Sequence, residues 1–161
     1  MKLSARQDIA APLAQVTEAM TDFERFERAI LRRGGEVTRL DPGAVPGVGS
    51  RWQCRLAHRG RSHEIESEIT VLEPCRRAVL DSRSGGVSAT LTVDLTALAA
   101  ARTRVVITVE MRPRTVPGRF FLQSLRLARR RINARFSDAV GRYARRIEAD
   151  AAAQGRRGSA G

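Results

Sequence analysis

The sequence predicts an α+β fold in which a curved, seven-stranded antiparallel sheet packs against a long C-terminal helix. Between residues 50 and 111 apolar side chains recur at every second position, as they do in strands that bury one face. From residue 118 to residue 152 they recur at every third and fourth position, which indicates one long helix with an apolar stripe. The residues of the stripe are Phe121, Leu125, Ala128, Ile132, Phe136, Ala139, Tyr143 and Ile147.

The N-terminal quarter of the chain predicts one strand, two short helices and a second strand. Residues 3–9 alternate and form the first strand, and Pro12 suits the first turn of a helix. Asp22 can cap a second helix, which Gly34 and Gly35 end before a short strand at residues 36–40. A loop rich in proline and glycine follows at residues 41–49.

The strand register of two hairpins can be predicted from the pairing that places the apolar residues on one face of the sheet. A turn at Arg59 and Gly60 predicts the inner pairs Trp52 with Ser67, Cys54 with Ile65 and Leu56 with His63. The outer pairs are then Arg51 with Glu68, Gln53 with Glu66 and Arg55 with Glu64, so opposite charges meet across the strands. A second turn at Ser84 and Gly85 predicts the pairs Leu80 with Ala89 and Ala78 with Leu91. The last strand turns Val105, Ile107, Val109 and Met111 inward.

The length of 161 residues predicts one domain, which we place at residues 1–152 with a flexible tail at 153–161. The formal net charge is +12, but Lys2 is the only lysine and the arginines are scattered, so we do not expect nucleic-acid binding. Cys54 and Cys75 stand far apart and have no histidine at ligand spacing. We therefore expect no metal, no cofactor and a cytoplasmic protein, since no signal peptide or membrane-spanning stretch is present.

The order of predicted elements resembles the helix-grip fold of the START/Bet v 1-like (SRPBCC) superfamily, above all its bacterial polyketide cyclase/dehydrase and lipid-transport branch. Three local strings carry the resemblance: PGVGSRW at residues 46–52, VLEP at 71–74, and GGVSATLTV at 85–93 followed by TRV at 103–105. It covers about residues 1 to 150. The resemblance implies a cavity between sheet and C-terminal helix that holds a lipid, a polyketide-like molecule or another apolar molecule.

We expect the ligand-binding residues to lie on the inner face of the sheet and on the stripe of the long helix. They are Trp52, Cys54, Ile65, Ser67, Leu80, Ala89, Leu91, Val109, Leu125, Arg129 and Ile132. Arg129 falls inside the apolar arc, where it either meets a ligand carboxylate or extends its head to water. His63 is the candidate general acid or base, with a rim position or a satisfied place in the core as the alternative. Glu64, Glu66 and Glu68 alternate on the solvent face and form a charge ladder.

The leading functional hypothesis is a binding or carrier module for a small hydrophobic ligand rather than an enzyme. The first alternative is a cyclase or dehydratase acting on a polyketide-like substrate. The second is a basic module that contacts an acidic partner or an anionic membrane. Phe120 and Leu127 lie on the far side of the long helix from the stripe and mark either a dimer contact or such a membrane surface, so both a monomer and a homodimer remain open.

Overall fold

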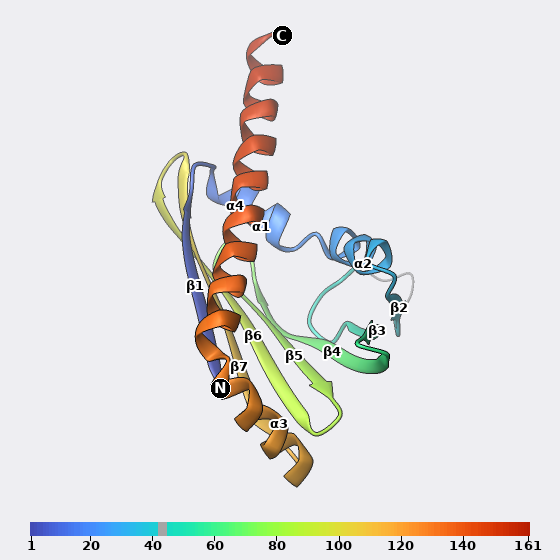
Figure 1. Ribbon diagram of the computed structural model, residues 1–161. Coiled ribbons are helices and arrows are strands. Elements are labelled where there is room, and N and C mark those ends of the chain that lie inside the picture. The colour runs from blue at the N-terminus through green and yellow to red at the C-terminus, as the bar shows by residue number, and fades with distance from the viewer. Residues whose placement is uncertain (42–44) are drawn as a thin grey trace.

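A computed structural model describes residues 1–41 and 45–161 and confirms the predicted α+β helix-grip architecture (Figure 1). The seven strands form one antiparallel sheet in the order β1-β7-β6-β5-β4-β3-β2. The strands are β1 (Lys2–Ile9), β2 (Glu36–Arg39), β3 (Arg51–His58), β4 (Arg61–Glu73), β5 (Arg77–Ser84), β6 (Val87–Ala99) and β7 (Arg102–Pro113). The helices are α1 (Leu13–Met20), α2 (Phe23–Arg32), α3 (Val116–Leu127) and α4 (Arg129–Ser159). Residues 42–44 of the predicted loop lie outside the described residues.

The two short helices begin where the sequence predicts them. Pro12 precedes α1, and the Asp22 side chain caps α2 by accepting a hydrogen bond from the backbone N–H of Arg25 at 3.0 Å. The Thr115 side chain caps α3 in the same way, accepting from the N–H of Gly118 at 3.1 Å. These side chains satisfy backbone donors that a helix start leaves without partners.

The predicted register of the β3–β4 hairpin is confirmed at every pair. Arg59 and Gly60 both adopt positive φ, as the tight two-residue turn requires. On the outer face Arg55 forms ion pairs with Glu64 at 3.0 Å and with Glu36 of β2 at 3.1 Å. These exposed pairs contribute little stability but penalise a slipped register, because a one-residue slip would turn the charges toward the core.

The predicted register of the β5–β6 hairpin is wrong by two residues. The turn is at Gly85 and Gly86, so Leu80 pairs with Leu91 and not with Ala89, and Ala78 pairs with Val93. Either glycine suits a turn, and a shift of two residues leaves every side chain on the face where it was predicted. The inner row of apolar residues is therefore unaffected by the error.

The single long helix predicted for residues 118–152 is two helices. The chain leaves helical geometry at Ala128, whose φ and ψ are −99° and 12°, and α4 then continues to Ser159. The break changes which residues are buried: Phe121, Ala128 and Ala139 of the predicted stripe are exposed. The buried residues of the two helices are Gly118, Leu122, Val140, Gly141, Ala144 and Ile147, and of these only Ile147 belongs to the predicted stripe. Residues 153–159, assigned to a tail, continue the helix beyond the sheet (Figure 1), and their flexibility stays a prediction.

The core consists of two apolar clusters on the inner face of the sheet. The first joins β1, α1, β6, β7 and α4 around Ile9, Val16, Val105 and Ile147. Its edge is fixed by the buried Thr103 hydroxyl, which donates to the carbonyl oxygen of Ala11 at 2.9 Å. The second cluster joins β3, β4 and the α2 side chains that pack on them. Its buried residues are Trp52, Cys54 and Ile69. One sheet face thus carries two cores with a space between them.

The start of α3 packs backbone to backbone on the β5–β6 turn, which gives a stability prediction. A Cβ atom at Gly118 would collide with the carbonyl oxygen of Gly86, whereas one at Gly155 of α4 would meet nothing within 4 Å. Gly118→Ala should lower the free energy of unfolding by about 1–3 kcal/mol despite alanine's higher helix propensity. Gly155→Ala should leave it unchanged or raise it by up to about 1 kcal/mol. Urea denaturation of both variants measures the difference, and equal effects would contradict the close packing.

Acid stability should depend on Asp8, whose carboxylate is paired across β1 and β7. Arg104 donates to Asp8 at 2.8 and 3.1 Å, and this bonding holds the Asp8 pKa below its ordinary value of 3.8. A lowered folded-state pKa contributes stability above the unfolded-state pKa, and the contribution disappears as pH falls through the folded-state pKa. Asp8→Asn should therefore be less stable than the parent protein near neutral pH, and the difference should vanish at strongly acidic pH. Urea midpoints across pH test this, with Asp138→Asn on the exposed face of α4 as the control.

Candidate functional site

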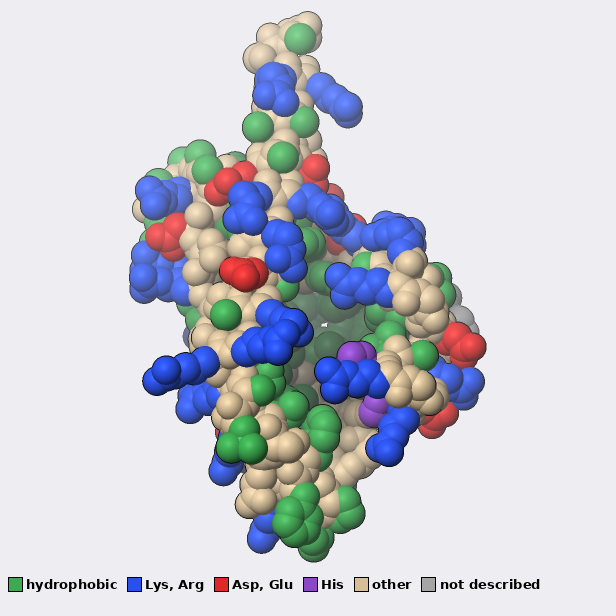
Figure 2. All heavy atoms as spheres, in the orientation of Figure 1, with side chains coloured by type: hydrophobic (Ala, Val, Ile, Leu, Met, Phe, Trp, Pro, Cys, Tyr) green, Lys and Arg blue, Asp and Glu red, His purple; other side chains and the backbone are tan. Residues whose placement is uncertain are grey.

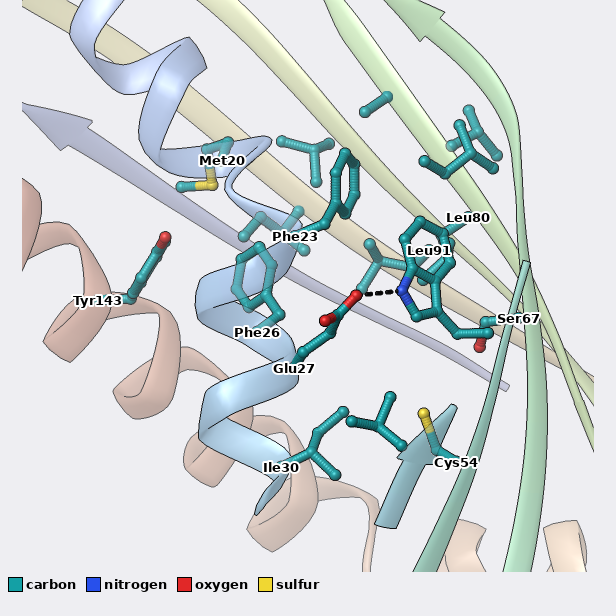
Figure 3. Close-up of a pocket in the computed structure, with 17 residues that line it drawn as sticks. Met20, Phe23, Phe26, Glu27, Ile30, Cys54, Ser67, Leu80, Leu91 and Tyr143 are labelled. Carbon is teal, nitrogen blue, oxygen red and sulfur yellow. Dashed lines mark hydrogen bonds between the residues drawn. The ribbon is translucent and has the colours of Figure 1, made fainter. Parts of the chain in front are cut away.

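A cavity of about 320 Å³, open to the surface on one side, lies between the two core clusters and is bounded mainly by α2, α4 and the inner face of β3–β6. Figure 2 shows it as a hollow with hydrophobic side chains on its floor, between α4 and the lobe that carries α2. Figure 3 shows the lining side chains converging from the helices and the sheet. They are Met20, Phe23, Phe26, Glu27, Ile30, Val37, Trp52, Cys54, Ser67, Ile69, Ala78, Val79, Leu80, Leu91, Val93, Ile107 and Tyr143.

Helix α2 forms one wall because its apolar residues share a face. Phe23, Phe26 and Ile30 recur at spacings of three and four, so all three turn toward the sheet and the cavity. The Phe23 ring lies 5.4 Å from that of Trp52 on β3, and the Phe26 ring lies 5.9 Å from that of Tyr143 on α4. These centroid distances are typical of favourable aromatic pairs. The helix therefore bridges the sheet and α4 across the cavity.

Glu27 is the only charged side chain among the described residues that line the cavity. Its Oε1 accepts a hydrogen bond from the indole Nε1 of Trp52 at 2.6 Å (Figure 3). Its second oxygen, Oε2, has no hydrogen-bond partner in the part of the chain that the structure describes. A carboxylate oxygen that borders an apolar cavity in this way can accept a hydrogen bond from a ligand.

The other polar groups of the lining are satisfied by the protein itself. The Tyr143 hydroxyl donates to the carbonyl oxygen of Ala19 at 2.6 Å, and burial raises the pKa of this tyrosine although nearby Arg25 lowers it in part. The Ser67 hydroxyl is hydrogen bonded to that of Ser82 at 2.8 Å. Both side chains thus hold elements together, and each hydroxyl oxygen keeps the capacity to accept a further hydrogen bond.

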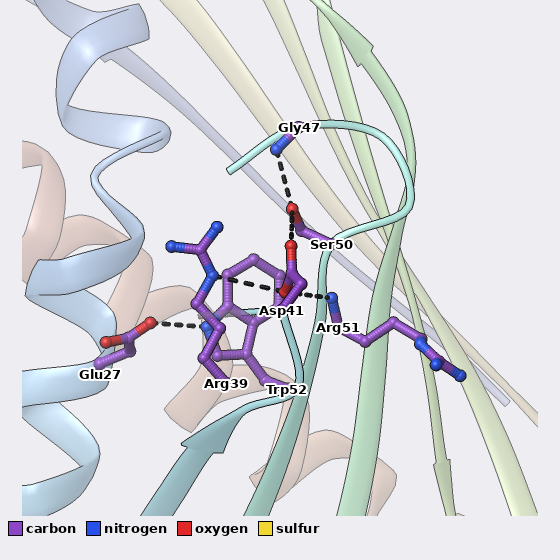
Figure 4. Close-up of polar contacts among 7 residues, drawn as sticks. All are labelled: Glu27, Arg39, Asp41, Gly47, Ser50, Arg51 and Trp52. Carbon is purple, nitrogen blue, oxygen red and sulfur yellow. Dashed lines mark hydrogen bonds and ion pairs between the residues drawn. The ribbon is translucent and has the colours of Figure 1, made fainter. Parts of the chain in front are cut away.

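A polar network fixes the loop and strand start behind Trp52 (Figure 4). Asp41 accepts from the Ser50 hydroxyl at 3.0 Å, and Ser50 Oγ accepts from the N–H of Gly47 at 3.0 Å. Desolvation raises the pKa of Asp41, but hydrogen bonds from Ser50, the Arg51 N–H and Arg39 outweigh it, and the pKa is lowered overall. The Arg39 guanidinium lies 5.7 Å above the Trp52 ring. The indole is therefore held from one side by Glu27 and from the other by a cation.

Within the described residues, the site contains no activated nucleophile or metal cluster. Burial, with a smaller contribution from Glu27, raises the pKa of the Cys54 thiol, so Cys54 is protonated and unreactive at neutral pH. Across residues 1–41 and 45–161, no group of three or more His, Cys, Asp or Glu side chains is arranged to hold a metal ion.

The structure brings together five of the eleven residues that the sequence analysis assigned to ligand binding. Those that line the cavity are Trp52, Cys54, Ser67, Leu80 and Leu91. Ile65 packs against the second core cluster without lining the cavity. Ala89, Val109, Leu125 and Ile132 lie elsewhere, along the sheet or on the helices.

The predicted place of Arg129 in the apolar arc is wrong. Arg129 is the first residue of α4 and is exposed, beside Lys2 and Ser4 in a shallow depression on the surface. The break at Ala128 causes the error, because the prediction assumed an unbroken helix when it assigned residues to one side. His63 is also exposed and does not line the cavity, which leaves it in the rim position weighed as the alternative.

The wall supplied by α2 was not predicted, and Glu27 with it. The three- and four-residue spacing of Phe23, Phe26 and Ile30 did indicate an amphipathic helix. Periodicity shows that a helix has a face to bury, but not which neighbour covers it. A glutamate within one turn of that apolar face, at the position of Glu27, is the signal that could have directed attention to this helix.

The family model for polyketide cyclase/dehydrase and lipid transport matches residues 1–148. The chain belongs to this family. The family name covers both enzymes and carriers, so membership supports a fold that binds hydrophobic ligands without choosing between the two. None of the curated proteins compared with the chain matches it.

Solved structures with low sequence identity share the fold. The crystal structure of TTHA0849 from Thermus thermophilus has a TM-score of 0.64 at 19% identity, covering 93% of this chain and 99% of that one. The ZhuI aromatase/cyclase from Streptomyces sp. R1128 has a TM-score of 0.63 at 19% identity, covering 91% and 95%. A norcoclaurine synthase from Thalictrum flavum has a TM-score of 0.62 at 12% identity, covering 78% and 82%.

The hydrogen bond between Glu27 and Trp52 should stabilise the fold as well as shape the cavity. Glu27→Ala leaves a buried indole N–H without its partner and should cost about 1–3 kcal/mol of unfolding free energy. Glu24→Ala, an exposed change on the same helix, should cost about 0.5 kcal/mol or less. Urea unfolding followed by fluorescence of Trp52, the only tryptophan, compares the two variants. Similar midpoints would show that the hydrogen bond is energetically unimportant.

Proposed function

We propose that the protein binds one small, largely apolar molecule in the cavity between α2, α4 and the sheet. The observation that carries the proposal is the cavity itself: about 320 Å³ of space with an almost wholly apolar lining, between two packed core clusters. Well-packed proteins leave few voids larger than a water molecule. A space of this size beside the core supports a binding function, and the family description agrees with a hydrophobic ligand.

The lining also restricts the ligand. The volume is at the lower end of the range for small-molecule sites, so a single-chain lipid, an aromatic compound or a compact polyketide-like molecule is favoured over a two-chain phospholipid. The rings of Phe23, Trp52 and Tyr143 favour a flat or unsaturated molecule. The free oxygen of Glu27 favours one that carries a hydroxyl or amino group at one end.

A fluorescent probe that matches this description, 1-aminoanthracene, tests the proposal directly. Ala78→Phe fills the cavity from β5 and should weaken probe binding by about tenfold or more. Ala97→Phe adds the same ring to an exposed position on β6 and should leave the affinity unchanged. Circular dichroism confirms that both variants fold. Unchanged affinity in folded Ala78→Phe would show that the probe binds elsewhere and would overturn the proposal.

An enzyme of the cyclase or dehydratase type is the second candidate, and Glu27 is the observation that favours it. A carboxylate is a competent general acid or base when it lies within hydrogen-bond reach of a bound substrate. Glu27→Gln keeps an acceptor for the Trp52 indole but removes the group that transfers a proton. Conversion of a polyketide-type substrate by the parent protein, lost in Glu27→Gln while binding remains, would support the enzyme. Equal turnover in both would exclude Glu27 as its catalytic residue.

A further inference from the structure

The outward face of α3 is apolar and has no partner within the described part of the chain. About 100° per residue places Val116, Phe120 and Leu127 within about 40° of one another, while the buried Leu122 lies on the opposite side of the helix. Their exposed fractions are 65%, 66% and 92%. Figure 2 shows hydrophobic side chains gathered at the end of the molecule where Figure 1 places α3. Three large apolar side chains on one exposed face are typical of an interaction surface.

Unpaired arginines surround this face. Between Glu110 and Asp138 the chain has eight arginines and no acidic residue. Arg112 is paired with Glu110 at 2.9 Å, and the remaining seven form no ion pair with any described residue. They are Arg114, Arg119, Arg126, Arg129, Arg130, Arg131 and Arg135. The outer face of the sheet differs, because Arg51, Arg55, Arg77 and Arg104 there are paired with carboxylates.

A shallow depression beside the end of α3 gathers two of these arginines and one lysine. Arg129 and Arg130 of α4 line it with Lys2 of β1, together with Ser4, Asn133 and Ala134. No carboxylate belongs to the lining that the described residues form, and two of the other side chains can donate hydrogen bonds. Cations and hydrogen-bond donors in one open depression fit a phosphate group. This observation is independent of the apolar face of α3 and points to the same kind of partner.

We propose that α3 docks on an anionic membrane surface. Val116, Phe120 and Leu127 enter the boundary between headgroups and acyl chains, and the surrounding arginines lie against the lipid phosphates. Arginine suits this role because its planar fork binds phosphate oxygens through two parallel hydrogen bonds. In the described part of the chain, no helix has the length and apolar character to span a bilayer.

Neither a second copy of the chain nor a nucleic acid matches both the charge and the apolar character of this face. A second copy related by two-fold symmetry would bring the unpaired arginines of both chains together, because such an interface pairs each surface patch with itself. A nucleic acid would neutralise the arginines, but its phosphate backbone would leave Val116 and Leu127 exposed. A membrane surface that is both anionic and apolar complements the whole face.

Vesicle co-sedimentation of the full chain tests the docking. Vesicles of phosphatidylcholine with about 30% phosphatidylglycerol should bind the protein at least about tenfold more tightly than phosphatidylcholine alone. Binding should weaken steeply between about 50 and 200 mM salt. The double variant Phe120→Ser with Leu127→Ser should lose about tenfold or more in affinity, and so should Arg129→Gln with Arg130→Gln.

Matched controls separate specific docking from general attraction. Leu98→Ser removes an exposed leucine at the end of β6, and Arg156→Gln with Arg157→Gln removes two charges at the other end of α4 (Figure 1). Both controls should bind the vesicles as the parent protein does. The proposal would be overturned if the Arg156/Arg157 variant lost as much vesicle affinity as the Arg129/Arg130 variant, or if the Phe120/Leu127 variant bound as tightly as the parent protein. Either result would show that vesicles attract the protein only through its overall positive charge.

Two further outcomes would also overturn it. A dimer that forms without lipid and disappears in Phe120→Ser with Leu127→Ser would assign the face to a second copy. Tight RNA binding without vesicle binding would assign it to nucleic acid. The vesicle experiment and the probe experiment can fail independently of each other. Ala78→Phe should bind vesicles as the parent protein does, because its change lies inside the fold and away from α3, whether or not the cavity binds 1-aminoanthracene.

Discussion

The inner face of the sheet is apolar across seven strands, and the helices have to keep this face away from water. Helix α4 lies along the β1 edge and, with α1, buries the first core cluster. Helix α2 covers the β2–β3 end and buries the second. The two helices contact each other through side chains such as the rings of Phe26 and Tyr143, but they do not fill the middle of the sheet, so β4, β5 and β6 are left with apolar side chains facing a space. The cavity forms because the sheet is wider than the helices that pack on it.

The polar contacts around the cavity keep it from collapsing. An apolar void tends to close, since its lining side chains gain contacts by moving inward. Trp52 is held in place by Glu27 on one side and by Arg39 on the other, and Asp41 ties the preceding loop to the start of β3. The ring contacts of Phe23 and Phe26 prop α2 between β3 and α4. These contacts fix the side chains of the wall, from within the lining at Glu27 and from behind it at Arg39 and Asp41.

The sequence predicted elements and faces better than it predicted their placement. The β3–β4 register was predictable because both charge pairing and apolar pairing agree on Arg59 and Gly60 as the turn. The β5–β6 register was not, because Gly85 and Gly86 offer two turns that bury the same face. The break at Ala128 has no local signal, since alanine and arginine are good helix formers and only packing ends the helix. That error placed Arg129 with the ligand. Glu27 was missed for a different reason, because periodicity did not show that α2 faces the cavity.

The contact between Gly86 and Gly118 links the outer surface of the molecule to its interior. Gly86 belongs to the turn between β5 and β6, and these strands carry Leu80 and Leu91 on the cavity wall. Gly118 belongs to the first turn of α3, and the Arg114 N–H adds a hydrogen bond to the Gly86 carbonyl at 2.7 Å. A helix attached in this way cannot tilt without either parting from the hairpin or drawing the hairpin tip along with it. The outward-facing helix α3 is thus joined by a direct backbone contact to the two strands that carry part of the cavity wall.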